Sequence, residues 1–105
     1  GGIVFLGKEF PEGYRGTFLL TRFGNFIRSP KENSGFDVLR ATLRRNAEGR
    51  YEGHFHTVLS GLGRPIDIHQ GAPGKLYIAE YSRAINSSES YGPSGRILEL
   101  SVVSR

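Results

Sequence analysis

Apolar residues in this chain occur in short runs, separated by segments rich in glycine, proline and polar residues. Ile3–Leu6 is an apolar run between two glycines, and Thr17–Phe23 is a longer stretch of β-forming residues. Runs of this length, bounded by turn-forming residues, are typical of buried β-strands. The segment between them, Gly7–Gly16, is predicted to be a loop whose Phe10 and Tyr14 side chains return to the core.

The stretch Phe36–Arg45 allows two interpretations. Its apolar residues mostly alternate with polar ones, as in a half-buried strand, but the alternation slips at Leu39 and Arg40. Leu, Arg and Ala are also good helix formers, so a helix is the alternative. We favour a strand because the related stretch Arg96–Val103 alternates more regularly.

The rest of the chain continues the pattern of strands and turns. Glycine-rich corners at 61–64 and 71–74 separate the apolar segments, and the long polar segments 24–34 and 82–94 are predicted to be loops. Pro65 opens one strand, a position at which proline is tolerated. The further predicted strands are Arg50–Leu59, Ile66–His69, Lys75–Tyr81 and Arg96–Val103.

One succession of elements occurs twice. Thr17–Phe23 is followed by a polar insert and then by Gly35–Ala41; Lys75–Tyr81 is followed by a polar insert and then by Gly95–Leu100. Repeated strands at this spacing are typical of propeller blades, each of which is a four-stranded antiparallel sheet. We therefore predict an all-β fold built from antiparallel β-propeller blades.

The two predicted blades are unequal. The first spans residues 1–62 and has four strands, whereas the second spans residues 63–105 and has three, so it is incomplete. Two blades cannot close a ring, and open blade edges invite pairing. The expected partner is therefore either the rest of a larger propeller or further copies of the chain.

Composition narrows the possible functions. The chain has 105 residues, of which 37% are hydrophobic and 15 are glycine, which favours strands and turns over helices. It has no cysteine, which excludes disulfides and zinc–thiolate sites. No apolar run approaches the roughly 20 residues of a transmembrane helix, so no membrane span is expected. The net charge of +4 comes from dispersed residues, with Arg44 and Arg45 as the only adjacent basic pair, which argues against nucleic-acid binding.

Three residues are candidates for binding a small anionic or sugar ligand. Arg64 lies at the mouth of a predicted inner strand, where a guanidinium can hold a carboxylate or phosphate by two hydrogen bonds. The alternative for Arg64 is a structural pair with Asp67, and Asp67 itself is expected to bond backbone N–H groups of the neighbouring blade. Arg22 and Asn25 lie where a predicted strand runs into a loop, a common place for binding groups.

The sequence predicts neither a metal site nor a catalytic residue. His54 and His56 share one face of a predicted strand, but a metal site needs three or four ligands. His69 stands alone; it could act as a general base near neutral pH, but because no partner residue is visible we favour a packed or solvated histidine. No nucleophile motif and no phosphate-binding glycine loop is present.

Four segments of the chain resemble motifs of one known family: Phe10–Gly16 (FPEGYRG), Gly63–Ile68 (GRPIDI), Ala72–Ala79 (APGKLYIA) and Gly95–Leu100 (GRILEL). Together they resemble the glucose/sorbosone dehydrogenase-like family, whose type members are soluble quinoproteins with a six-bladed propeller. They follow the order and spacing of the family's last two blades. The resemblance implies that the chain is a C-terminal fragment of about two blades out of six.

The resemblance also implies an activity and cofactors for the intact protein. Such a protein would oxidise a sugar or alcohol with pyrroloquinoline quinone and Ca²⁺, in the periplasm or outside the cell. Arg64 matches an arginine that contacts the carboxylates of the quinone, whereas Ile66 and Pro73 depart from the family pattern. The family's catalytic histidine belongs to an earlier blade, so this chain alone is expected to be inactive. The alternative is a non-enzymatic module that binds a ligand or a protein and closes its ring by oligomerising.

Overall fold

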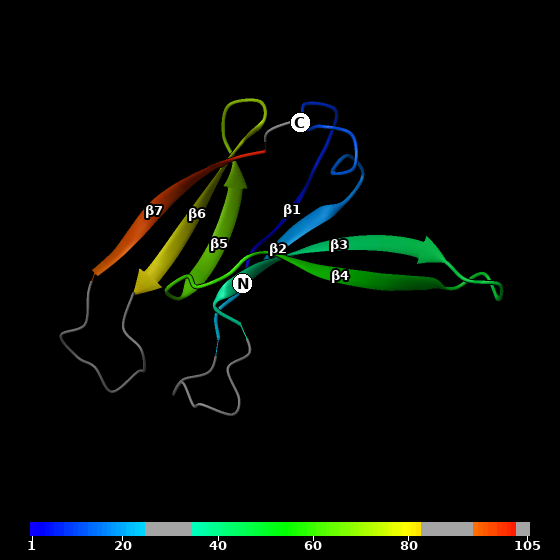
Figure 1. Cartoon of the computed structure of the whole chain (residues 1–105), viewed down its shortest axis with the longest axis horizontal. Helices are drawn as coiled ribbons and strands as arrows, with labels where there is room; N and C mark the ends of the chain where they lie inside the picture. The colour runs from blue at the N-terminus through cyan, green and yellow to red at the C-terminus, as the bar shows by residue number, and fades with distance from the viewer. Residues whose placement is uncertain (25–34, 83–93, 103–105) are drawn as a thin grey trace.

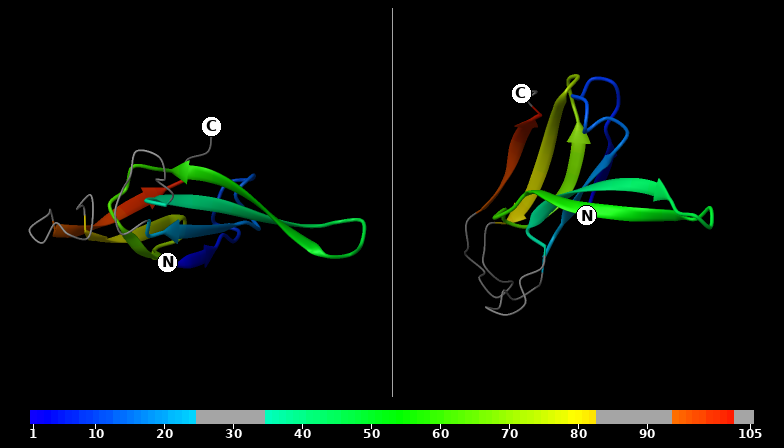
Figure 2. Two further views of the ribbon diagram at one scale, coloured as in Figure 1. Left: turned by 90° about the horizontal axis from the view of Figure 1, so that it is seen from below. Right: turned by 45° about the vertical axis from the view of Figure 1, so that its right-hand side comes forward.

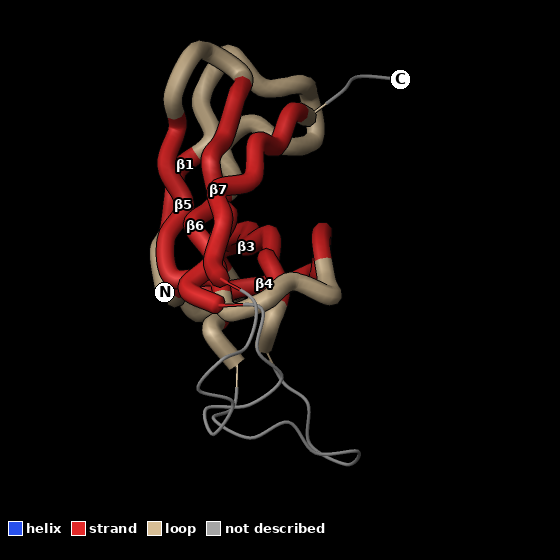
Figure 3. Tube along the Cα trace, turned by 90° about the vertical axis from the view of Figure 1, so that its left-hand side faces the viewer, coloured by secondary structure: helices blue, strands red, loops and turns tan. Residues whose placement is uncertain are grey.

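The computed structural model describes residues 1–24, 35–82 and 94–102, and its strands are all antiparallel (Figure 1). Figure 3 shows strands and loops and no helix in this described part. The all-β prediction is therefore confirmed, and the stretch that allowed either a helix or a strand is a strand. The strands are β1 (Ile3–Phe5), β2 (Phe18–Arg22), β3 (Asp37–Arg45), β4 (Tyr51–Leu59), β5 (Pro65–Gln70), β6 (Lys75–Ser82) and β7 (Ser94–Ser101).

The strands form two sheets, each of which follows the order of the chain. The first sheet has the order β1-β2-β3-β4 and the second has the order β5-β6-β7. Contacts between the sheets are made by β1 and β2 with β5. In Figure 1 these three strands lie at the centre, with β3 and β4 extending to one side and β6 and β7 to the other. The two sheets thus meet at their first strands and diverge towards their last.

The hydrophobic core lies between the two sheets. Leu19 and Val38 of the first sheet belong to one buried cluster with Ile68, Leu76 and Ile78 of the second. The same cluster contains Leu6, Phe10 and Leu62, and Tyr14 packs against it. The prediction that Phe10 and Tyr14 fix the first loop to the core is confirmed. Burying this apolar surface from both sheets at once is what holds them together.

Two β-bulges interrupt the ladders. The pairing of β3 with β4 shifts between Val38, which pairs with Leu59, and Leu39, which pairs with Thr57, so the extra residue is Val58 of β4. The pairing of β5 with β6 shifts between Pro65 and Asp67. A bulge adds one residue to one strand, so the side chains after it point to the opposite face from that expected.

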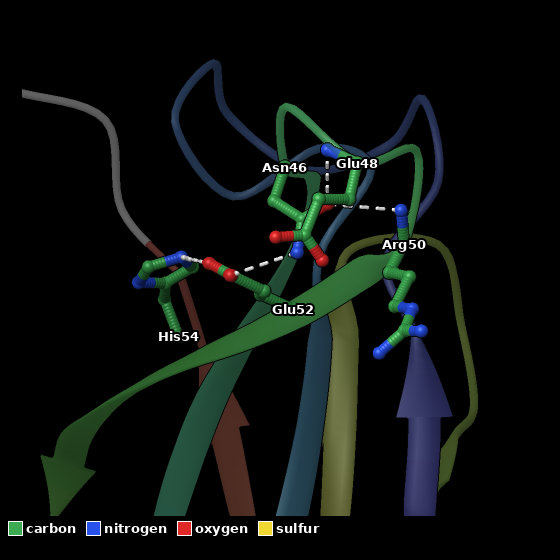
Figure 4. A network of polar contacts seen from close by, with 5 residues as sticks. All are labelled: Asn46, Glu48, Arg50, Glu52 and His54. Carbon is green, nitrogen blue, oxygen red and sulfur yellow. Dashed lines mark hydrogen bonds and ion pairs between the residues drawn. The ribbon is translucent and has the colours of Figure 1, made fainter.

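The β3–β4 hairpin extends beyond the other strands, as both views of Figure 2 show. Its turn is organised by Asn46, whose Oδ1 accepts hydrogen bonds from the backbone N–H of Glu48 (2.9 Å) and Arg50 (3.0 Å). Asn46 Nδ2 also donates to Glu52 Oε1 at 3.1 Å (Figure 4). Gly49 adopts a φ of 80°, a conformation that favours glycine. The turn therefore needs both its asparagine and its glycine.

Candidate functional site

Polar and aromatic side chains gather where β2 ends, β3 begins, β6 ends and β7 begins, beside the corner that precedes β5. We call this group the corner cluster. In Figure 1 these strand ends lie at the lower side of the molecule. The cluster joins the two sheets at the end where the sequence predicted ligand binding. Its members are Arg22, Phe23, Phe36, Asp37, Gly63, Arg64, Glu80, Tyr81 and Arg96.

Arg64 lies at the centre of the corner cluster. Its side chain stacks on two aromatic rings, with Cζ 4.9 Å from the centroid of Phe23 and 5.0 Å from that of Phe36. The residue is 2% exposed, so these cation–π contacts are shielded from water and strengthened. Its carbonyl oxygen accepts a hydrogen bond from Tyr81 N–H at 2.7 Å. Arg64 therefore links the second sheet to both ends of the β2–β3 connection.

Phe36 reaches this position through an unusual backbone conformation. Its φ is 58°, in the left-handed region that non-glycine residues rarely adopt. Its carbonyl oxygen accepts a hydrogen bond from Leu62 N–H at 3.0 Å, which ties it to the corner before β5. Gly24 lies against the ring of Phe36, and any Cβ there would overlap it. Such strain persists only where the surrounding structure holds it, and here it places the ring against Arg64.

Arg22 and Asp37 form a two-point ion pair across β2 and β3. Arg22 Nε donates to Asp37 Oδ1 at 2.8 Å, and Nη2 donates to Oδ2 at 2.7 Å. The two residues are register partners, so the pair closes the end of the hairpin. Asp37 is buried, and the guanidinium of Arg22 stays partly exposed. The hydrogen bond to Asp37 is the main cause that raises the pKa of Arg22 above its usual value.

Glu80 forms the matching pair in the second sheet. Its carboxylate accepts hydrogen bonds from Arg96 Nε and from the backbone N–H of Gly63. Glu80 and Arg96 are register partners on β6 and β7. The Glu80 side chain is fully buried, whereas that of Arg96 is about half exposed. A buried carboxylate is tolerated here because both of its oxygens are hydrogen-bonded to donors, one of them charged.

The structure brings two of the three predicted binding residues into the same cluster. Arg22 lies at its edge, and Arg64 lies at its centre. Asn25 falls outside the described residues. From the sequence, Glu80 is considered only as the start of a loop that could cover a channel mouth, and its ion pair with Arg96 was not predicted. The available signal was a pair of opposite charges flanking each polar insert, at matching places in the two repeats.

Asp67 bonds within its own strand. Its Oδ1 accepts a hydrogen bond from the backbone N–H of Ile68 at 2.9 Å, where the sequence analysis expected a bond to the neighbouring blade. A β-bulge lies directly before Asp67 in the strand. His54 is exposed and lies 3.8 Å from Glu52, measured from Nε2 to Oε2 (Figure 4). Within residues 1–24, 35–82 and 94–102, no three potential ligands are grouped as a metal site.

Arg64 is the residue predicted to contact a quinone. It is 2% exposed and stacks on the rings of Phe23 and Phe36, so it is less accessible to a cofactor than Arg22. Arg22 is the more accessible cation, because two of its five N–H donors are bonded to Asp37 and its side chain is partly exposed. The two arginines therefore differ: Arg64 is buried and joins the two sheets, whereas the charge of Arg22 is accessible to solvent.

Comparison of the chain with protein-family models, curated proteins and solved structures finds no match in any of the three. Among the described residues, no helix has the length and apolar character needed to cross a membrane.

Proposed function

We propose that this chain is a wall segment of a β-propeller similar to the glucose/sorbosone dehydrogenase-like proteins, contributing two neighbouring blades and no catalytic base. The observation that carries the proposal is the arrangement of the sheets. Each is an antiparallel sheet in chain order, and contacts between them involve the first strands, β1 and β5, together with β2. Blades around a propeller axis share this plan.

The corner cluster supports a structural role within such a wall. Two buried carboxylates, Asp37 and Glu80, are each paired with an arginine, and Arg64 is held between aromatic rings. Each ion pair holds the strands of its own sheet together, and the stacking of Arg64 on Phe23 and Phe36 joins the two sheets. In the intact protein, the oxidation of a sugar or alcohol would be carried out by the cofactor with residues outside this chain. Arg22 is the residue here that could contact an anionic ligand.

A dye-reduction assay tests the absence of catalysis. The purified chain is incubated with pyrroloquinoline quinone, Ca²⁺, an electron-accepting dye and a set of sugars and alcohols. We expect no reduction above that of the same mixture without protein. Turnover by the chain alone would overturn the proposal that it forms part of the propeller wall and contributes no catalytic residue.

A titration followed by NMR tests the ligand contact. Arginine Nε–H signals of the ¹⁵N-labelled chain are recorded while the quinone or inorganic phosphate is added. We expect a saturable shift for Arg22 and none for Arg64, which is buried. Arg44, exposed on β3, reports general attraction of anions to a basic chain. Equal shifts for Arg22 and Arg44 would remove the ligand contact from the proposal.

A further inference from the structure

Each sheet buries one face and leaves the other open. The open face of the first sheet carries mostly apolar side chains, and we call it outer face one. Its members are Ile3, Phe5, Phe18, Leu20, Leu39, Ala41, Leu43 and Phe55, which follow one another across the registers of β1 to β4. The open face of the second sheet, which we call outer face two, carries Tyr77, Ala79 and Ile97 together with the polar residues Asp67, His69, Lys75 and Glu99. Six residues line an open hollow of about 150 Å³ on the second sheet: Asp67, Ile68, His69, Tyr77, Ala79 and Ile97.

The two sides of the projecting β3–β4 hairpin differ in polarity, and only the side that belongs to outer face one is apolar. Along the extended part of the β3–β4 hairpin, the opposite side carries the exposed polar residues Arg44, Glu52 and His54. On the side of outer face one, the same part of the hairpin carries Leu43 and Phe55, both more than half exposed. Both sides are open, yet only one is apolar. Contiguous exposed apolar surface of this kind marks an interaction site.

Aligning the two repeats shows which surface of one sheet is equivalent to the open face of the other. Aligning Thr17–Phe23 with Lys75–Tyr81 places Leu20 at the position of Ile78. The strand registers then extend the match to the neighbouring strands: Ile3, the partner of Leu20, corresponds to Ile68, the partner of Ile78. Ile68 is 4% exposed and lies in the core, whereas Ile3 is 63% exposed. Outer face one therefore corresponds to the buried face of the second sheet.

The same correspondence holds on the other side. Thr21 aligns with Ala79, so Val38, the register partner of Thr21, corresponds to Ile97, the register partner of Ala79. Val38 is 0% exposed within the core between the sheets, whereas Ile97 is 68% exposed. Outer face two therefore corresponds to the buried face of the first sheet. The two open faces are the two halves of the interface that already joins the sheets inside this chain.

We propose that outer face two of one chain packs against outer face one of a second copy, head to tail, by repeating this internal interface. A second copy is the occupant that the structure favours, because both complementary halves lie on the same chain. Such an interface joins two different surfaces, so it continues from copy to copy until a ring closes or a stack forms. In the isolated chain, the second copy takes the place that neighbouring blades would take in the larger propeller proposed above, and the inference does not depend on the chemistry proposed there.

Cross-linking tests the orientation, and the absence of cysteine in the chain makes introduced cysteines unique. Ile3→Cys and Ile97→Cys are placed on separate chains, one of them ¹⁵N-labelled, and the two are mixed and treated with a short thiol cross-linker. We expect mixed labelled–unlabelled dimers at least about fivefold above the dimers formed by either variant alone. His54→Cys, on the polar side of β4, replaces Ile3→Cys in the control mixture. All three sites are exposed, so the substitutions leave the core intact.

The yields decide between the possible outcomes. Dominant Ile97→Cys homodimers would indicate a symmetric contact and overturn the head-to-tail arrangement. Mixed dimers no more abundant than in the control mixture would overturn the contact itself. Light scattering over a dilution series gives an independent measure. We expect more than one chain per particle for the unmodified protein and for His54→Lys, and a single chain for Ile97→Lys. A monomeric unmodified protein at the highest concentration would overturn the proposal, whatever the result of the dye and NMR experiments.

Discussion

The hairpins β2–β3 and β6–β7 carry an ion pair at the same place in the repeat, but with the charges exchanged. In the first, the arginine is on the earlier strand and pairs with Asp37 on the later one. In the second, Glu80 is on the earlier strand and pairs with Arg96 on the later one. Both pairs join register partners, and each lies at the end of the hairpin where the chain passes from one strand to the next.

The two carboxylates differ in what else they hold. Both carboxylate oxygens of Asp37 accept hydrogen bonds from Arg22, within one hairpin. Glu80 also accepts the backbone N–H of Gly63, in the corner that precedes β5 and adjoins Arg64. The Arg22–Asp37 pair therefore stabilises only its own hairpin. The Glu80–Arg96 pair stabilises its hairpin and also the segment that connects the two sheets. The exchange of charges is what allows this, because a carboxylate on β6 can accept a backbone donor and an arginine there could not.

The largest expected effect is that of Glu80→Ala. It leaves the N–H of Gly63 without its acceptor and removes the partner of Arg96, so we expect a loss of about 3 kcal/mol in the free energy of unfolding. Urea denaturation followed by circular dichroism measures it. Glu99→Ala, at a half-exposed carboxylate on β7, is the control and is expected to cost less than about 0.5 kcal/mol. Equal costs at the two positions would refute the distinction between the hairpins.

Exchanging the two charged residues within each ion pair gives a second test of the difference between the hairpins. The double variant Arg22→Asp with Asp37→Arg keeps an ion pair inside its hairpin, so we expect stability within about 1 kcal/mol of the unmodified protein. Glu80→Arg with Arg96→Glu instead turns donors towards Gly63 N–H, and we expect a loss of about 2 kcal/mol. The same urea measurement applies to both. Full recovery by the second exchange would show that the bond to Gly63 contributes little.

Asp37→Asn is expected to have a smaller effect, of about 1 kcal/mol. The amide keeps the shape of the side chain and one hydrogen-bond acceptor. The negative charge that pairs with the partly exposed Arg22 is lost. The same substitution also removes the main cause of the raised pKa of Arg22. A loss as large as that from Glu80→Ala would mean that Asp37 supports more than its own hairpin.

The smallest effect is expected at an exposed carboxylate that also joins the two sheets. Glu9 accepts a hydrogen bond from the Gln70 side chain, and this bond is the main cause that lowers the pKa of Glu9 below its ordinary value of 4.5. Because the folded pKa is the lower one, the contribution to stability is complete above pH 4.5 and is lost as the pH falls through the folded pKa. An NMR titration of Glu9 should show its pKa rising towards 4.5 in Gln70→Ala. An unchanged titration would show that the bond is not formed in solution.

The order of the strands could be predicted from the sequence, because each strand shows a local pattern of β-forming residues between turn residues. The corner cluster could not be predicted in the same way. It depends on contacts between residues far apart in the sequence, such as Glu80 with Gly63, and on the left-handed backbone of Phe36. The burial of Arg64 likewise depends on two rings brought together by a hairpin, which no local pattern encodes.

The pairing of strands in chain order also has a consequence for the rate at which the protein folds. Every ladder joins consecutive strands, so each sheet can form from neighbouring segments before the sheets meet. Contacts of β1 and β2 with β5 span the longer separations, and contacts of that kind are made late because they close longer loops. We therefore expect substitutions in the docked core, such as Ile68→Val, to accelerate unfolding while leaving the refolding rate nearly unchanged in stopped-flow experiments.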